Sequence, residues 1–162
     1  VKLLVKNKAN TEGALWYAAA DGHTEVIKYI LSVERKLHLK TIPYGQDTTP
    51  LGIACYNGRS EIIEILINAG AKINSSDGPL ILLAESSNVD DAVSKSIAEQ
   101  LVSHGVDIHY YYGKYEQRTA LYYACLSNKL QLASYLISLG SDVNFIHYHH
   151  HEDYPETVLA LA

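Results

Sequence analysis

Residues Thr48–Asn74 read TTPLGIACYNGRSEIIEILINAGAKIN, and residues Thr119–Asn144 repeat the pattern as TALYYACLSNKLQLASYLISLGSDVN. Each copy joins a short segment rich in small residues to a longer segment whose apolar residues recur at helical spacing. A chain that repeats one helix–turn–helix unit is expected to form a stack of units. Such a stack offers an extended surface rather than an enclosed reaction site.

The repeated unit extends over nearly the whole chain. A leucine opens the first helix of each copy, and a Gly or Asn suited to a left-handed backbone separates the two helices. We expect one domain over 1–162, in which the third copy carries a lengthened middle. Its parts are a partial repeat at 1–10, repeats at about 11–45, 46–76, 77–112 and 113–146, and a partial repeat at 147–162.

Local signals mark where the helices begin. Pro50 suits the first turn of a helix, with Thr48 and Thr49 as candidate caps. Asp90 and Asp91 stand at an expected helix start, where they favour the helix dipole and are interpreted as caps.

These signatures resemble the ankyrin repeat. Residues Thr48–Asn74 are close to the family pattern TPLHxAAxxGHxEVVxLLLxxGADVN, and Ala14–Leu31 matches it too, including the GHxEV core. The resemblance implies an all-α ankyrin-repeat solenoid, in which helix–turn–helix units stack and hairpin-like finger loops project from them. It also implies a concave groove between the finger tips and the exposed side of the first helices.

The chain departs from the family pattern at two kinds of position. Trp16, Gly52 and Tyr122 replace the His of TPLH, so we expect packing adjustments and weaker hydrogen bonding between turn and helix. The joint after Asn74 is too short for a full finger, whereas the joint after His109 is long. Loops tolerate such changes in length and often carry binding residues.

Composition limits the classes of function. The chain has 162 residues, 48% of them hydrophobic, and a formal net charge of −5. The acidic balance argues against nucleic acid or an anionic membrane as the main partner, and it suggests a partner face that is basic or mixed. There is no apolar run of about 18 residues and no signal-peptide pattern.

Two cysteines and the absence of Met complete the compositional picture. Cys55 and Cys125 occupy equivalent repeat positions, so we expect small buried residues rather than a disulfide, in a reducing, intracellular, cytoplasmic setting. The absence of any Met predicts a piece of a longer protein, monomeric as a segment. The irregular spacing and residue usage resemble ankyrin proteins of intracellular bacteria and large viruses, which would allow delivery into a host cell.

No catalytic motif is recognisable, so we expect no enzyme activity and no cofactor. The run from His147 to Asp153 is rich in His and carboxylates that could bind a transition metal. Alternating residues of an extended finger point to opposite sides, however, which favours a solvated polar finger and no metal site.

The expected function is recognition of another protein through a rigid scaffold. Exposed tyrosines are frequent in interfaces, although part of the Tyr110–Tyr115 cluster could instead pack the finger against its neighbours. Carried over by repeat position, the concave face would present Tyr44, Gln46, Asp47, Tyr56, Asn57, Tyr111, Tyr112, Glu116, Arg118, Leu126, Ser127 and His149. Two alternatives stay open: a regulatory or substrate-docking arm of a larger enzyme or effector, and a purely architectural spacer.

Overall fold

The computed structural model describes residues 13–33, 39–40, 42–43, 45–112, 118–144, 146–147 and 156–157. Within these ranges the chain forms four pairs of helices and two short antiparallel hairpins. The pairs are α2 (Ala14–Asp21) with α3 (Thr24–Val33), α4 (Pro50–Tyr56) with α5 (Ser60–Asn68), α6 (Pro79–Glu85) with α7 (Asp91–Ser103), and α8 (Ala120–Leu126) with α9 (Leu130–Ser138). The all-α repeat solenoid is therefore confirmed.

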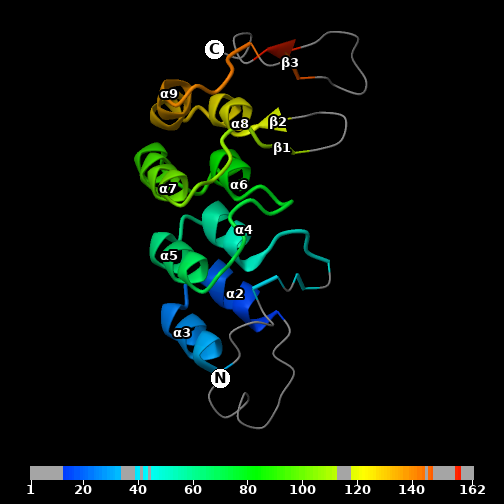
Figure 1. Cartoon of the computed structure of the whole chain (residues 1–162), viewed down its shortest axis with the longest axis vertical. Coiled ribbons are helices and arrows are strands. Elements are labelled where there is room, and N and C mark those ends of the chain that lie inside the picture. The colour runs from blue at the N-terminus through cyan, green and yellow to red at the C-terminus, as the bar shows by residue number, and fades with distance from the viewer. Residues whose placement is uncertain are drawn as a thin grey trace.

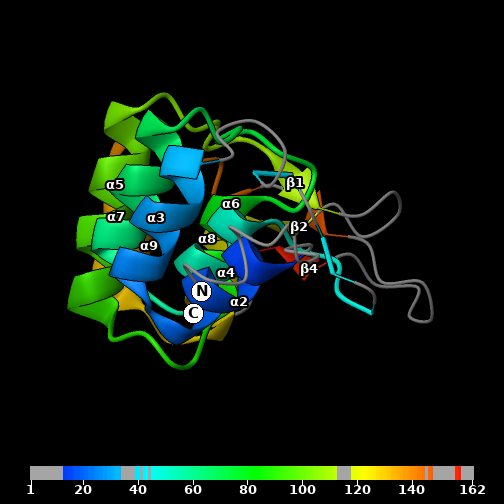
Figure 2. The same ribbon diagram turned by 90° about the horizontal axis from the view of Figure 1, so that it is seen from below.

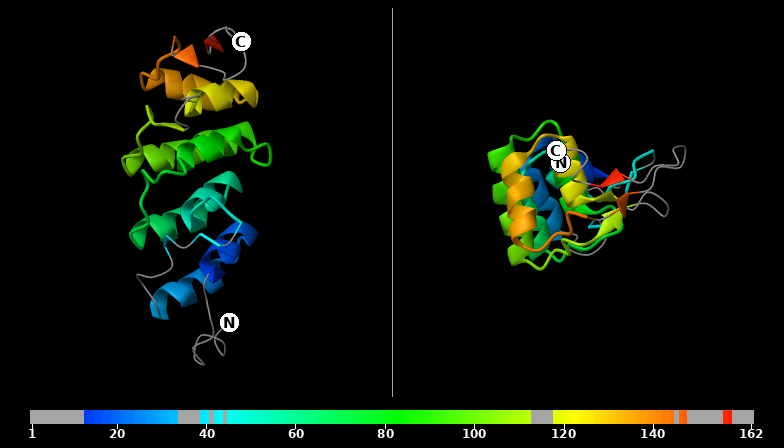
Figure 3. Two further views of the ribbon diagram at one scale, coloured as in Figure 1. Left: turned by 90° about the vertical axis from the view of Figure 1, so that its right-hand side faces the viewer. Right: turned by 90° about the horizontal axis from the view of Figure 1, so that it is seen from above.

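The helices form two parallel columns (Figure 1). The inner column holds α2, α4, α6 and α8, each packed on the next, and the outer column holds α3, α5, α7 and α9. Loops project from the inner column away from the outer helices, as Figure 2 shows from below. The molecule is consequently an elongated stack, one helix pair per layer (Figure 3).

The fingers differ in length as the sequence indicates. Strands β1 (Tyr111–Tyr112) and β2 (Arg118–Thr119) pair with Tyr111 opposite Thr119, so the long joint after His109 forms a hairpin. Strands β3 (Ile146–His147) and β4 (Glu156–Thr157) pair likewise. The short joint after Asn74 makes only tight turns before α6.

The core lies between the two columns. The leucines that open the inner helices are 1–3% exposed, and Ala54 and Ala124 are fully buried. Small side chains at these positions let neighbouring inner helices approach closely, while each buried Leu or Ile contributes about 1.5–3 kcal/mol. Cys55 is fully buried and Cys125 partly so, both as free thiols. Burial raises the pKa of both thiols.

The expected backbone conformations occur at the turns between paired helices. Gly58 has a φ of 65°, and Asn128 adopts the same left-handed region at 55°. Pro50 is the first residue of α4, and Thr49 rather than Thr48 is its side-chain cap, since Thr49 Oγ1 accepts a hydrogen bond from the Gly52 N–H at 3.1 Å.

Polar side chains connect successive layers on the outer column. Asp91 accepts hydrogen bonds from the N–H groups of Gln131 and Leu132 at 2.7 and 3.0 Å, so it caps α9 of the next layer. Asp90 is the N-cap residue of α7 and Asp91 lies in its first turn, as expected, but the Asp90 side chain makes no cap hydrogen bond and that of Asp91 caps α9. Lys129, the residue just before α9, reaches the inner column of the preceding layer. Its Nζ donates a hydrogen bond to the Leu83 carbonyl of α6 at 2.8 Å.

A further outer contact centres on Glu64. Its carboxylate accepts a hydrogen bond from Gln100 Nε2 at 2.7 Å and lies 3.2 Å from His104 Nε2, both in the next layer. The Gln100 hydrogen bond, followed by those of Asn68 and His104, lowers the pKa of Glu64. Within the described ranges, none of the helices has both the length and the apolar character that crossing a membrane requires.

Candidate functional site

Two positions in each inner helix recur along the face of the inner column. The first follows the position of Trp16 directly, and the second lies three residues further on. Most members are at least partly accessible; Tyr17 is 53% and Leu126 57% exposed, whereas Tyr123 is buried. The two rows are Tyr17, Ile53, Leu82 and Tyr123, and Ala20, Tyr56, Glu85 and Leu126. They give the inner column a mixed aromatic, aliphatic and acidic surface.

Hydrogen bonds between finger and helix survive the loss of the family's His. Trp16 donates from Nε1 to the carbonyl and hydroxyl oxygens of Thr48, at 3.0 and 3.2 Å. At the next layer, Asp77 Oδ2 accepts from the Thr49 N–H at 2.7 Å and from its hydroxyl at 2.8 Å. Hydrogen bonds therefore join finger and stack at both layers without the family's His, while the expected weakening of this bonding stays a prediction.

Gly52 makes the Asp77 contact possible. A Cβ at position 52 would overlap Asp77 Oδ2, and it would lie 2.9 Å from Leu82 Cδ1. The carboxyl group therefore occupies space that a side chain at position 52 would take. At the third substituted position, the Arg118 guanidinium lies 5.5 Å from the centroid of the Tyr122 ring, within cation–π range.

Asp77 also forms part of a groove on the finger side of the stack. We call the loop before α4 the second finger; its described residues are 39–40, 42–43 and 45–49. The groove has a volume of about 200 Å³ and runs between this finger and helices α6 and α8. Its acidic lining comes from Asp47, Asp77 and Glu85, and its apolar lining from Ile81, Leu82 and Tyr123. Asp77 is 6% exposed, and its Oδ1 has no hydrogen-bond partner within the described part of the chain.

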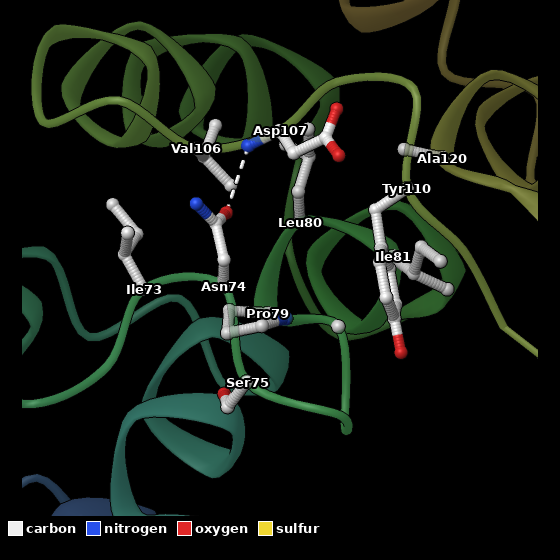
Figure 4. Close-up of a pocket in the computed structure, with 11 residues that line it drawn as sticks. Ile73, Asn74, Ser75, Pro79, Leu80, Ile81, Val106, Asp107, Tyr110 and Ala120 are labelled. Carbon is white, nitrogen blue, oxygen red and sulfur yellow. Dashed lines mark hydrogen bonds between the residues drawn. The ribbon is translucent and has the colours of Figure 1, made fainter.

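A second depression is a seam between fingers rather than a ligand site. Figure 4 shows Asn74 reaching across it, with its side-chain oxygen accepting from the Asp107 N–H at 2.8 Å. The Asn74 amide donates to the Gly105 carbonyl at 3.2 Å, and the Tyr110 hydroxyl donates to the Ser76 carbonyl at 3.0 Å. A volume of about 10 Å³ admits one water molecule at most, so this seam joins layers and leaves no room for a ligand.

The structure distributes the residues expected on the concave face among three situations. Gln46, Asp47, Tyr111 and Leu126 are exposed, and Tyr56 is half-buried. Asn57 donates to the Ala20 carbonyl at 3.2 Å and Ser127 to the Glu85 carbonyl at 3.3 Å, so these two side chains and Arg118 make contacts within the stack. Tyr44, Glu116, His149 and the Tyr112 side chain lie outside the described residues.

Tyr17, Asp77 and Glu85 belong to the same face but were absent from the sequence-based set. Tyr17 and Glu85 occupy the recurring inner-helix positions, so strict repeat register would have found them. No sequence pattern points to Asp77, because the space for its carboxyl group is left by Gly52, a residue of another layer. The His147–Asp153 run also lies outside the described residues except for His147, and no metal-binding cluster of His, Cys, Asp or Glu occurs among those that are described.

The fold and its inner face define a solenoid of repeated helix pairs. A family model described as "Ankyrin repeats (3 copies)" matches residues 1–77, and a second, described as "Ankyrin repeat", matches residues 116–145. The chain belongs to the ankyrin-repeat family, whose repeats are generally protein-interaction modules without catalytic activity of their own.

Three curated proteins illustrate how widely such repeats are used. The chain is 32% identical over 125 residues, 77% of its length, to the ankyrin repeat and KH domain-containing protein mask-1 of Caenorhabditis elegans. It is 26% identical over 83% of its length to the nuclear factor NF-kappa-B p105 subunit of Gallus gallus, and 33% over 61% to alpha-latrocrustotoxin-Lt1a of Latrodectus tredecimguttatus. The matched parts are 4%, 14% and 7% of these relatives.

Proposed function

We propose that this chain is a protein–protein interaction module that presents its inner helical face and finger loops to a partner protein. The observation that carries the proposal is the recurrence of accessible side chains at equivalent inner-helix positions, among them Tyr17, Tyr56 and Leu126. Tyr111 adds a tyrosine that is 45% exposed on the neighbouring finger. Large, rigid aromatic side chains are typical of the residues that dominate binding energy.

The mechanism is rigid presentation. Hydrogen bonds from Trp16 to Thr48 and from Thr49 to Asp77 fix the second finger against α2 on one side and against the turn before α6 on the other. Asn74 likewise fixes the turn between α7 and β1, through its bonds to the Asp107 N–H and the Gly105 carbonyl. Because these loops are held before a partner arrives, less conformational entropy is lost on binding than for a flexible surface.

Affinity capture from a cell lysate followed by titration of the captured protein tests this proposal. The inner-face variant carries Tyr17→Ala, Tyr56→Ala and Tyr111→Ala. The matched control carries Val93→Ala, Leu130→Ala and Ile137→Ala, which remove exposed apolar side chains from the outer helices. We expect the inner-face variant to lose its partner while the control retains it, with both variants folded as judged by circular dichroism. Loss of the partner by the control variant alone would place the binding surface on the outer helices instead.

A second candidate function, a docking arm of a larger protein, rests on how small a part of each relative this chain matches. The chain corresponds to at most 14% of the relatives described above, which carry such repeats within much longer proteins. In that setting the same inner face would bring a substrate or regulator to another part of the parent protein. Deleting these repeats from the parent would then change its affinity for that partner and leave the turnover of a minimal substrate unchanged.

A further inference from the structure

We propose that the groove between the second finger and helices α6 and α8 accepts one basic side chain, Arg or Lys, from the partner. This inference rests on the proposed function and specifies the chemistry of the partner at one place on that face. The groove combines the carboxyl groups of Asp47, Asp77 and Glu85 with apolar walls from Ile81, Leu82 and Tyr123.

Charge complementarity selects the occupant. Among the residues that the structure describes, no Lys, Arg or His lines the groove. Its three acidic residues come from the second finger, the turn before α6, and α6 itself. Asp47 and Glu85 are exposed, so each can meet an incoming cation without a change in the stack. A cationic side chain can donate charge-assisted hydrogen bonds to such carboxylates, which are stronger than bonds between neutral groups.

Asp77 also carries a buried oxygen whose hydrogen-bonding capacity is unused within the described chain. This residue is nearly buried in the lining, and Oδ2 is fully engaged by Thr49 at 2.7 and 2.8 Å, whereas Oδ1 has no hydrogen-bond partner in the described chain. A buried polar atom without a partner is costly and is rarely left so in a folded protein. Because Asp77 lines the groove, a cation entering it would stabilise this carboxyl group electrostatically.

Size and wall chemistry favour a long side chain over a small molecule. The volume of about 200 Å³ is below the range of roughly 300–1,000 Å³ that is typical of small-molecule pockets. Arg and Lys carry an apolar stem below a charged head, so Ile81 and Leu82 can cover the stem while the carboxylates meet the head. The Tyr123 ring adds an aromatic surface that attracts cations.

An NMR titration with short peptides tests the groove without the natural partner. The probes are acetyl-Gly-Arg-Gly-amide, its lysine counterpart, and the same peptide with citrulline, which keeps the shape of arginine but is neutral. We expect the arginine and lysine peptides to shift the backbone amides of Thr48, Asp77 and Tyr123, with affinities about tenfold higher than the citrulline peptide. Equal affinity for the citrulline peptide, or shifts confined to other amides, would overturn the proposal.

Matched variants distinguish binding in the groove from nonspecific attraction to the negative charge of the protein. Asp47→Asn with Glu85→Gln should weaken the arginine peptide about tenfold, whereas Glu61→Gln with Glu99→Gln changes the net charge equally on the outer helices and should leave it unchanged. Asp77→Asn keeps an oxygen acceptor for Thr49 but removes the charge, so it should weaken binding while the fold persists. An equal loss in the outer-helix control would show nonspecific attraction and overturn the proposal.

The same variants distinguish this inference from the proposed function. A partner that binds the inner face should lose about tenfold in affinity for the Asp47→Asn, Glu85→Gln protein. Undiminished affinity of that partner would overturn the basic-side-chain inference and leave the interaction module standing. A partner whose affinity is unchanged by the three tyrosine substitutions would contradict the proposed interaction module, regardless of how the peptides bind.

Discussion

At the scale of single residues, Gly52 and Asp77 act as a pair across two layers. Replacing Gly52 by Ala would drive a Cβ into Asp77 Oδ2 and bring it 2.9 Å from Leu82 Cδ1. We expect Gly52→Ala to lower the free energy of unfolding by about 1–3 kcal/mol, as overpacking of a close-packed interior does. Urea unfolding followed by circular dichroism measures the change.

A double-mutant cycle provides the control for this pair. Asp77→Ala alone removes the acceptor for Thr49 and should itself destabilise the protein. In that background Gly52→Ala should cost less, because the carboxyl group it overlaps is gone. Strictly additive costs would mean that the two residues do not share this space.

The pair also marks a limit of sequence reasoning. The pattern predicted that Trp16, Gly52 and Tyr122 are packing adjustments, and Trp16 is indeed 7% exposed and Tyr122 4%. It missed the compensating hydrogen bonds, because each partner belongs to a finger whose length varies from copy to copy. Thr48 lies 32 residues from Trp16, and no local period connects them.

At the scale of elements, the start of α9 is capped by a residue of the preceding layer. Asp91 accepts from the N–H groups of Gln131 and Leu132 at 2.7 and 3.0 Å, although it belongs to α7. We expect Asp91→Ala to cost about 1 kcal/mol of stability, as the loss of a helix cap does, and to speed amide hydrogen exchange at Gln131 and Leu132.

Asp90→Ala is the matched control, since it removes the same charge from the same end of α7. Asp90 makes no side-chain cap hydrogen bond, so only its attraction to the helix dipole is lost. Exchange at Gln131 and Leu132 should then stay as in the unmodified protein. Faster exchange with both variants would assign the effect to charge near α7 rather than to the cap on α9.

Elements were predicted well wherever a local signal exists. Pro50 and Thr49 begin α4, and Gly58 and Asn128 turn the chain between helices, as the sequence indicates. The role of Asp91 was misplaced because a carboxylate at a helix start looks like a cap for that same helix. Which neighbouring N–H it meets depends on how layers stack, and that is set by side chains in two repeats at once.

At the scale of the whole molecule, the stack is a one-dimensional array of layers. Each inner helix packs on its neighbours in the column and on the outer helix of its own layer, so the inner face keeps its form only while the layers hold register. The sequence predicted this architecture from one repeated pattern. The groove with Asp77 could not be predicted, because Asp47, Glu85 and Tyr123 come together only when three layers are stacked.

The effect of an overpacking substitution on the other layers should depend on whether its layer lies inside the stack or near its end. Ala54 is fully buried in α4, which packs on α2 and α6, whereas Ala124 is buried in α8, which among the described helices of the inner column packs on α6 alone. We expect Ala54→Leu and Ala124→Leu each to cost about 1–3 kcal/mol by overpacking. Ala54→Leu should also uncouple α2 and α3 from the rest, because it disturbs two interfaces between layers.

Urea unfolding followed at two sites checks this difference. Trp16 fluorescence reports on α2, and far-ultraviolet circular dichroism reports on all the helices. The two transitions should separate for Ala54→Leu and coincide for Ala124→Leu, because only the former weakens the contact with α2. Tyr111→Ala, on a finger and 45% exposed, should shift the midpoint least. A loss of stability for Tyr111→Ala equal to that for Ala54→Leu would contradict the assignment of core and finger, since the close-packed column would then contribute no more than a projecting loop.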